Sequence, residues 1–376
     1  MEPVIPGVTL PASELGYYSL TLIISSIVHE VGHAIAAVRE DVHLSNVGVR
    51  LFFILPVAYV SLNTDDIQKL NSKKSLKIFC AGVWHNIVLS LGAYVIYLIL
   101  PIIFSSLYNL NSGVIVTDIA KNSPLKGENG ILLHDKIMQI NDCVVTNSKK
   151  WYECLQKTKS NKLGFCVTAD AVNVLDETSD VSHISNGEIN CCAPGKFSSV
   201  CFEYIEHNDG IVEIPPHSCL PVRPVIEKSL KFCNVDVSCP EGLHCIKPLL
   251  NNSTHILKIT CVHKDIIYMG HPYDLLTVHV SSYIPKYSFI SSNAADTFER
   301  FIMYIALFSF GFAIINVIPC FFMDGQHIIS ALLNYVLTPR IGDEKVVATI
   351  SLSVTLCGTF FLFCFMIYGV WTHLPL

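Results

Sequence analysis

His29, Glu30 and His33 have the residue types and the spacing of a metal-dependent hydrolytic site. On a helix, residues four positions apart lie on one face with Cβ atoms about 6 Å apart, so both histidines can direct a ring nitrogen at one ion. Zinc binds imidazole nitrogen at about 2.0–2.1 Å and suits such a pair. Glu30 is placed to act as a general base rather than as a ligand. The predicted cofactor is one Zn²⁺ ion per chain.

A catalytic zinc site needs a third protein ligand and one open position. Asp324, in the stretch NVIPCFFMDGQ over Asn316–Gln326, is the predicted third ligand. A carboxylate at the end of an apolar run requires a partner that offsets its desolvation. The alternative is that Asp324 caps a helix over Gln326–Val336. Among the other histidines none has ligand spacing, and His85 is the closest candidate.

The segments around these residues are apolar enough to lie in a membrane. Of the 376 residues, 51% are hydrophobic and 15% are charged, against about 25% charged in soluble domains. The net charge of −6, without a long basic cluster, argues against nucleic acid as a partner. The first residues lack the features of a signal peptide. Spans long enough for a bilayer, about 20 residues, are predicted at Leu15–Val38, Gly82–Leu107, Phe301–Met323 and Val346–Thr372.

The polar region Asn109–Glu299 has the composition of an extracytoplasmic domain. No paired CxxC pattern of a zinc ribbon occurs, so its cysteines favour disulfides formed in an oxidising lumen. Two overlapping sequons at Asn251 and Asn252 predict glycosylation. Eleven of the 15 cysteines lie in this region, an odd number, so at least one thiol is left unpaired. The eleven are Cys143, Cys154, Cys166, Cys191, Cys192, Cys201, Cys219, Cys233, Cys239, Cys245 and Cys261.

Loop charges give the same orientation as the cysteines. The loop Arg39–Lys77 is rich in Lys and Arg, whereas Ser105–Ala120 has neither. The positive-inside rule then places the first loop in the cytosol and the polar region in the lumen. In this topology His29 and His33 lie in the cytosolic half of the first span, and Asp324 lies at the cytosolic end of the third. The metal ligands are therefore predicted at one membrane depth.

Three motifs together identify a family resemblance. HEVGHA (His29–Ala34), AGVWHN (Ala81–Asn86) and NVIPCFFMDGQ (Asn316–Gln326) resemble the site-2 protease family of intramembrane zinc metalloproteases. The long cysteine-bearing insert resembles its animal Golgi members in particular. The resemblance implies a set of roles: zinc ligands His29, His33 and Asp324, catalytic Glu30, and Asn86 and Asn316 as residues that hold the substrate strand or polarise the scissile carbonyl.

The resemblance also implies a function and partners. The expected substrates are transmembrane helices of membrane-anchored transcription factor precursors in sterol and stress responses, cut after a first lumenal cleavage. The expected location is the Golgi or endoplasmic reticulum membrane, with the lipid bilayer as a partner. The alternatives are a non-catalytic adaptor that uses the PDZ-like domain and a metal transporter. A third alternative is an inactive truncated isoform, because family members carry further membrane helices before the HExxH span.

The predicted fold class is a polytopic α-helical membrane protein with a lumenal, PDZ-like, cysteine-rich α+β insert. The expected domains are a membrane region over 1–107, the lumenal domain over 108–297 and a second membrane region over 298–376. The PDZ resemblance rests on Gly113–Val145, and such a domain could bind a cut substrate end by adding a strand to its sheet. Equally, the insert could only limit access to the active site.

Three further segments complete the predicted organisation. Asp170–Tyr283 has no clear periodicity and is interpreted as a loop-rich, disulfide-linked elaboration of the PDZ-like fold. Tyr268–Pro285, which overlaps its end, alternates like a strand that could close that fold. Leu44–Leu62 is apolar but contains Gly48, Arg50 and Pro56, so it is expected to form a re-entrant hairpin beside the active site.

Overall fold

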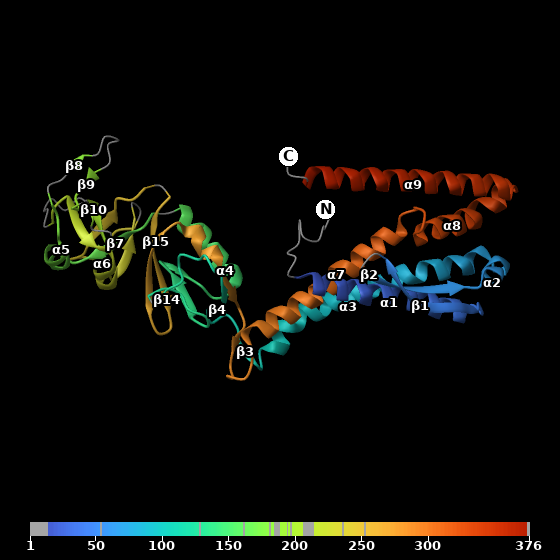
Figure 1. Ribbon diagram of the computed structural model, residues 1–376, viewed down its shortest axis with the longest axis horizontal. Coiled ribbons are helices and arrows are strands. Elements are labelled where there is room, and N and C mark those ends of the chain that lie inside the picture. The colour runs from blue at the N-terminus through green and yellow to red at the C-terminus, as the bar shows by residue number, and fades with distance from the viewer. Residues whose placement is uncertain are drawn as a thin grey trace. The chain divides into compact units, whose positions relative to one another are not determined.

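The computed structural model describes residues 14–52, 55–127, 129–160, 162–179, 182–183, 189–193, 195, 198–205, 214–234, 237–251 and 253–373. The chain forms two compact units: Met1–Ile103 with Thr297–Leu376, here called the membrane unit, and Phe104–Asp296, called the insert (Figure 1). The elements of the membrane unit are α1 (Leu15–Arg39), β1 (Leu44–Phe52), β2 (Leu55–Leu62), α2 (Thr64–Lys69), α3 (Ser72–Phe104), α7 (Ser292–Val317), α8 (Asp324–Ile341) and α9 (Glu344–His373).

Among the described residues, four helices, α1, α3, α7 and α9, are long and apolar enough to cross a membrane. The prediction of four such segments is confirmed, but the predicted end of the third is wrong. Helix α7 ends at Val317 and does not continue to Met323. The residue before a proline is disfavoured in helical conformation, so Pro319 stops the helix. Phe322 then adopts a left-handed backbone with φ of 69°. A non-helical turn therefore precedes Asp324.

Helices α1, α3 and α7 pack together through small polar side chains. The Oγ atoms of Ser25 in α1 and Ser309 in α7 lie 2.8 Å apart, and both residues are buried. Ser90 Oγ of α3 donates to the carbonyl of Ala306 in α7 over 2.7 Å. Small side chains let helix backbones approach closely, and hydroxyl groups bond across the contact. These contacts fix the faces of α1 and α3 that carry the predicted site residues.

The turn between α7 and α8 is tight and is held from two sides. A Cβ atom at Gly325 would lie 2.0 Å from the carbonyl oxygen of Ile318, so only glycine fits there. The backbone N–H of Phe321 donates to Thr359 Oγ1 of α9 over 3.1 Å. The glycine of the Asp-Gly pair is thus required for the turn that positions Asp324.

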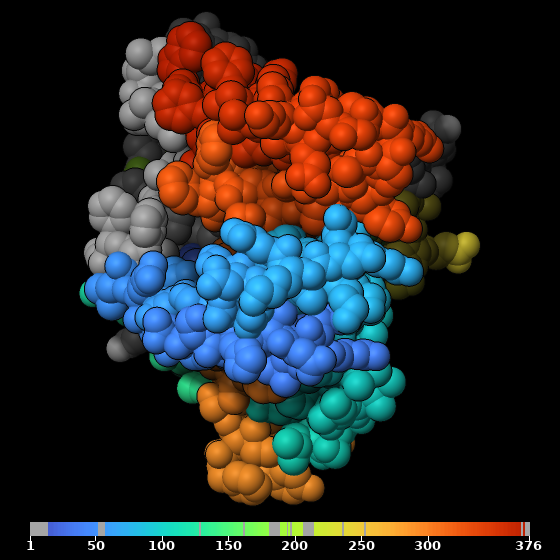
Figure 2. Space-filling model, turned by 90° about the vertical axis from the view of Figure 1, so that its right-hand side faces the viewer, coloured from blue at the N-terminus to red at the C-terminus, as the bar shows by residue number. Residues whose placement is uncertain are grey.

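Helix α8 also lies against the beginning of α3. The rings of Phe79 in α3 and His327 in α8 are stacked with centroids 5.1 Å apart. Figure 2 shows this side of the membrane unit, with α8 in orange next to the light-blue residues of α2 and the start of α3. The blue residues of the β1–β2 hairpin lie on the other side of α3 in this view.

The segment Leu44–Leu62 forms an antiparallel hairpin of β1 and β2, as predicted. Gly48 pairs with Tyr59, and a Cβ atom at Gly48 would lie 3.1 Å from the tyrosine ring. Strand β2 lies beside α1, because the backbone N–H of Ala58 donates to Ser26 Oγ over 2.9 Å. The hairpin is therefore attached to the helix that carries HExxH. Its re-entrant position in a bilayer stays a prediction.

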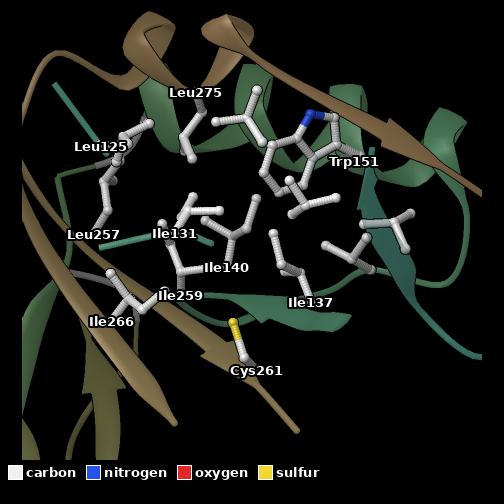
Figure 3. Packing of buried hydrophobic residues seen from close by; sticks show 14 of the residues in the cluster. Leu125, Ile131, Ile137, Ile140, Trp151, Leu257, Ile259, Cys261, Ile266 and Leu275 are labelled. Atoms are coloured by element: carbon white, nitrogen blue, oxygen red, sulfur yellow. The ribbon is translucent and has the colours of Figure 1, made fainter. Parts of the chain in front are cut away.

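The first part of the insert is a six-stranded sheet whose core is shown in Figure 3. The strand order is β15-β14-β5-β4-β16, and β6 pairs with β5. Trp151 of α4 is fully buried against Ile137 and Ile140 of β5 and Leu257 of β14. Burial of each such aliphatic side chain stabilises the fold by about 1.5–3 kcal/mol. The elements here are β3 (Tyr108–Asn109), β4 (Val114–Ile119), β5 (Lys136–Ile140), β6 (Cys143–Val144), α4 (Ser148–Ser160), β14 (His255–Cys261), β15 (Asp265–Gly270), η2 (Pro272–Thr277), β16 (Val278–Ser281) and β17 (Ile284–Pro285).

The predicted single strand Tyr268–Pro285 is interrupted. Pro272 begins a 3-10 helix, η2, and the side chain of His271 and that of Asp274 cap it reciprocally. Proline at the first helical position has no amide hydrogen to leave unpaired, which favours this break. Only Val278–Ser281 pairs with β4 and closes the sheet.

The second part of the insert, expected to be loop-rich, contains a five-stranded sheet. Its strand order is β11-β10-β13-β7-β12. Phe165 of β7 and Phe202 of β10 are buried in its own core. The elements are β7 (Gly164–Val167), α5 (Ala169–Leu175), β8 (Ser182–His183), β9 (Ile189–Asn190), β10 (Ser199–Ile205), β11 (His217–Pro221), α6 (Val222–Lys228), β12 (Lys231–Cys233) and β13 (His244–Pro248).

Disulfides link strands and loops of the insert, as predicted from its cysteines and from the missing zinc-ribbon pattern. Cys261 is the thiol that remains, and it is buried in the six-stranded sheet. Burial raises the pKa of the Cys261 thiol to about 12, which keeps it protonated at neutral pH. The five disulfides are Cys143–Cys154, Cys166–Cys239, Cys191–Cys201, Cys192–Cys219 and Cys233–Cys245.

Candidate active site

His29 and His33 lie on one face of α1 and converge at their ring nitrogens. Their Nε2 atoms are 3.1 Å apart, and the residues are only 3% and 8% exposed. The ring of Phe312 in α7 packs edge-on against His29, with centroids 5.3 Å apart. Helical geometry brings the two histidines to one face, and the neighbouring helix closes that face from water.

Asp324 brings a carboxylate oxygen to both histidines from a distant part of the sequence. Its Oδ2 atom lies 2.7 Å from His29 Nε2 and 3.1 Å from His33 Nε2. Asp324 is the first residue of α8, whose N-cap is Met323 and which has no side-chain capping hydrogen bond. The carboxylate thus contacts the histidines and does not cap the helix.

The three donor atoms fit a zinc ion. His29, His33 and Asp324 each offer one ligand atom, and these atoms lie within 4.8 Å of one another. Ligand atoms at three corners of a zinc tetrahedron are about 3.4 Å apart, given bonds of about 2.0–2.1 Å. The separations of 2.7 to 3.1 Å come close to that spacing. Two imidazoles and a carboxylate, with a fourth position open, are a donor set of catalytic zinc.

Glu30 lies next to this cluster and is held by the hairpin. Its Oε2 atom accepts a hydrogen bond of 2.8 Å from the backbone N–H of Val60 in β2. Among the residues that the structure describes, Glu30 is not one of the converging donors. An anchored carboxylate beside a metal site is placed to take up and release a proton. Sequence reasoning predicted the hairpin but not this amide donor, because a backbone group carries no residue signal.

Asn86 and Asn316 are both buried, and the structure gives each a different partner. The side-chain amide of Asn86 in α3 lies 3.1 Å from His29 Nδ1. Asn316 Nδ2 donates to the carbonyl of Phe312, one turn earlier in α7, over 3.0 Å. Asn86 thus belongs to the surroundings of the histidines, whereas Asn316 lies one turn beyond a residue that contacts His29. His85 Nδ1 contacts the carbonyl of Ala81 over 2.7 Å, away from the cluster.

Sequence reasoning missed the role of the α3 backbone behind the histidines. His33 Nδ1 lies 2.8 Å from the carbonyl oxygen of Ile78. Ile78 is eight positions before Asn86, which is two turns along the same helix face. The spacing of eight residues between Ile78 and Asn86 was therefore the signal from which this backbone contact could have been predicted.

The two predicted glycosylation positions differ in what the structure describes. Asn251 is exposed and lies between β13 and β14 of the insert. Asn252 lies outside the described residues. An exposed loop asparagine is accessible for glycan attachment.

Comparisons with known proteins agree with the geometry of the membrane unit. The model of peptidase family M50 matches residues 17–361, which include all three sequence motifs. A membrane-bound transcription factor site-2 protease homolog of Arabidopsis thaliana is 23% identical over 388 aligned positions, covering 88% of this chain and 72% of the relative. The chain, with HExxH on one candidate membrane helix and Asp324 beyond another, therefore belongs to peptidase family M50, the zinc-dependent intramembrane metalloproteases.

Proposed function

We propose that this protein is a zinc endopeptidase that cuts transmembrane helices of membrane-anchored transcription factor precursors after a first lumenal cleavage. The observation that carries the proposal is the convergence of His29, His33 and Asp324 beside Glu30, with the two histidines and Glu30 on a helix long enough to span a membrane. The name of the Arabidopsis relative, a membrane-bound transcription factor site-2 protease homolog, supports the substrate class. Sterol-regulatory and stress-response precursors are the proposed members of that class.

In this proposal each residue has a separate role. His29 and His33 would hold zinc through Nε2, and Asp324 would hold it through Oδ2. When bound, zinc supplies a Lewis acid that acidifies water and polarises a carbonyl group. Glu30 accepts a proton from the attacking water and returns it to the leaving amide nitrogen, so that one peptide bond and one water become a carboxylic acid and an amine. Val60 keeps the Glu30 carboxylate in place during both transfers.

The substrate must be unwound before it can be cut. Peptide bonds inside a helix are shielded because their carbonyl and amide groups are hydrogen-bonded to each other. We propose that Asn86 and Asn316 help to hold the unwound strand or polarise its scissile carbonyl, since carboxamides offer both donors and acceptors. A first cut that shortens the lumenal part of the substrate loosens its helix and prepares this step.

The reaction is tested with the purified full-length chain in proteoliposomes. The substrate is a single-span precursor with a short lumenal end, and the same precursor with an intact lumenal domain is the control. We expect cleavage of the short form only, loss of cleavage on treatment with a zinc chelator, and recovery when zinc is added. A protein that binds the short form without cutting it, with zinc present, would be an adaptor instead.

We further propose that the insert is lumenal and PDZ-like, in a protein of the Golgi or endoplasmic reticulum membrane. The proposed domains are 1–107, 108–297 and 298–376. The disulfides, the exposed Asn251 and the basic residues near the start of α3 support this orientation. Binding of a cut substrate end at a sheet edge is the proposed role of the PDZ-like part.

Orientation is tested in sealed microsomes whose cytosolic face is outward. A membrane-impermeant amine reagent should label the exposed Lys73 and Lys74 but not the exposed Lys149 of the insert. A glycan on Asn251 should resist endoglycosidase until detergent opens the vesicles. Labelling of Lys73 and Lys149 together in intact vesicles would overturn the orientation, because it would place both on one side.

A further inference from the structure

One face of α3 lies directly behind the two histidines. Ile78, Gly82 and Asn86 are spaced by four residues and therefore share that face. The first contacts His33 through its carbonyl oxygen, and the last contacts His29 through its side chain. Both contacts are made to Nδ1, the ring nitrogen that faces away from Asp324, because Asp324 contacts Nε2 of each ring.

The partner of Nδ1 decides which nitrogen of a neutral histidine can bind a metal. A neutral imidazole carries one N–H group, and its other nitrogen has the free lone pair. The carbonyl of Ile78 can only accept a hydrogen bond, so Nδ1 of His33 must donate, over 2.8 Å. Nε2 of His33 is then the atom with the free lone pair, as a metal ligand requires.

Asn86 can impose the same tautomer, with the proton on Nδ1, on His29. The residue is fully buried, and its Oδ1 atom has no hydrogen-bond partner among the described residues. Rotating the carboxamide by half a turn exchanges Oδ1 and Nδ2, whose shapes are nearly the same. Oδ1 then accepts from Nδ1–H of His29, and Nε2 keeps its lone pair. The rotation gives the oxygen a donor and both histidines the same tautomer, and it places Nδ2 where Oδ1 lay.

Gly82 lies between Ile78 and Asn86 on α3 and leaves space at the Nε2 atoms of the two histidines. A Cβ atom at this position would lie 2.4 Å from His33 Nε2 and 2.6 Å from His29 Nε2. Real Cβ contacts are not that short, so any other residue would push against the two nitrogens that face the metal. By contrast, a Cβ atom at Gly92 of the same helix would meet nothing within 4 Å.

We propose that this face of α3 is a positioning device for the metal site. Ile78 and Asn86 fix the two histidines with their Nε2 lone pairs free, and Gly82 keeps the volume at those atoms open. The inference rests on the proposed function, since it assumes that the histidines bind zinc. It gives Asn86 a task that exists before any substrate binds, in addition to the proposed contact with the substrate strand.

Gly82→Ala tests the open volume, with Gly92→Ala as the matched control. Both changes raise helix propensity, so neither weakens α3 by itself. In the purified full-length chain in detergent, we expect Gly82→Ala to lower zinc affinity at least about tenfold and Gly92→Ala to leave it unchanged. Circular dichroism of both metal-free variants should match that of the parent. Equal zinc affinity in the two variants would refute the role of Gly82.

Asn86→Leu and Asn86→Asp test the hydrogen-bond acceptor. Loss of an outer-shell partner of a ligating histidine typically costs about 10–100-fold in metal affinity, so we expect that loss in Asn86→Leu. Asn86→Asp keeps an acceptor and should retain metal affinity and the visible spectrum of the cobalt-substituted protein. If both variants bind metal like the parent and only KM rises, Asn86 contacts substrate alone. If the parent itself binds neither zinc nor cobalt, the proposed function fails instead.

Discussion

Glu30→Gln should abolish peptide-bond cleavage while the protein keeps its zinc. Glutamine has the shape of glutamate, and its side-chain oxygen can still accept the hydrogen bond from Val60 N–H, so the side chain stays in place. The amide cannot take up the proton that the reaction releases. General acid–base catalysis contributes about 10²–10⁴-fold, and we expect a fall in kcat of that size. The measurements are the cleavage rate in proteoliposomes and the zinc content of the same preparation.

Glu344→Gln is the matched control for this change. It removes the same charge at an exposed position at the start of α9, and it should leave the cleavage rate and the zinc content unchanged. A Glu30→Gln protein that loses zinc together with activity would contradict the assignment of Glu30 as a base. Glu30 would then belong to the coordination sphere.

Asp324→Ala should remove zinc and activity together. The carboxylate is the donor that contacts both histidines, at 2.7 and 3.1 Å, and alanine leaves two neutral ligands. The loss of affinity should exceed the roughly 10–100-fold change that follows loss of an outer-shell partner. Asp324→Asn keeps the shape but not the charge, so its zinc affinity should fall less than that of Asp324→Ala. Asp324→Glu should retain part of the affinity, because its longer side chain still ends in a carboxylate. Zinc titration of the purified chain measures this order.

Asp65→Ala controls for removal of an acidic side chain from the membrane unit. Asp65 is an exposed residue in the first turn of α2, and its loss should change neither zinc content nor cleavage. Circular dichroism should show that the Asp324 variants keep their helices. Full zinc occupancy and full activity in Asp324→Ala would require another third ligand and would end the proposed arrangement.

The local features of this protein follow from its sequence alone. The spacing of His29 and His33 puts both on one helix face, because four residues span about one turn. The four long apolar helices follow from composition, since a bilayer admits only segments of that length and character. The unpaired thiol follows from an odd count, although the count does not say that it is Cys261.

Features that depend on contacts between distant residues needed the tertiary structure. Loop charges predicted a similar membrane depth for Asp324 and the histidines, but depth does not fix distance within the membrane plane. That distance depends on the break after Val317 and on the turn around Gly325, whose missing side chain lets it pass the carbonyl of Ile318. The five-stranded sheet of the insert was also hidden, because its strands other than β10 and β11 pair with partners far apart in sequence and leave no regular period.

The contacts that orient the site residues are the least visible from the sequence. Glu30 is held by the amide of Val60, and His33 by the carbonyl of Ile78. Every residue carries such backbone groups, so residue identity does not mark the ones that matter. Side-chain types and their helical spacing thus determined which chemistry this chain can perform. The packing of α3, α7 and the hairpin around α1 decided which atoms face one another, because directions across helices are set only when the helices meet.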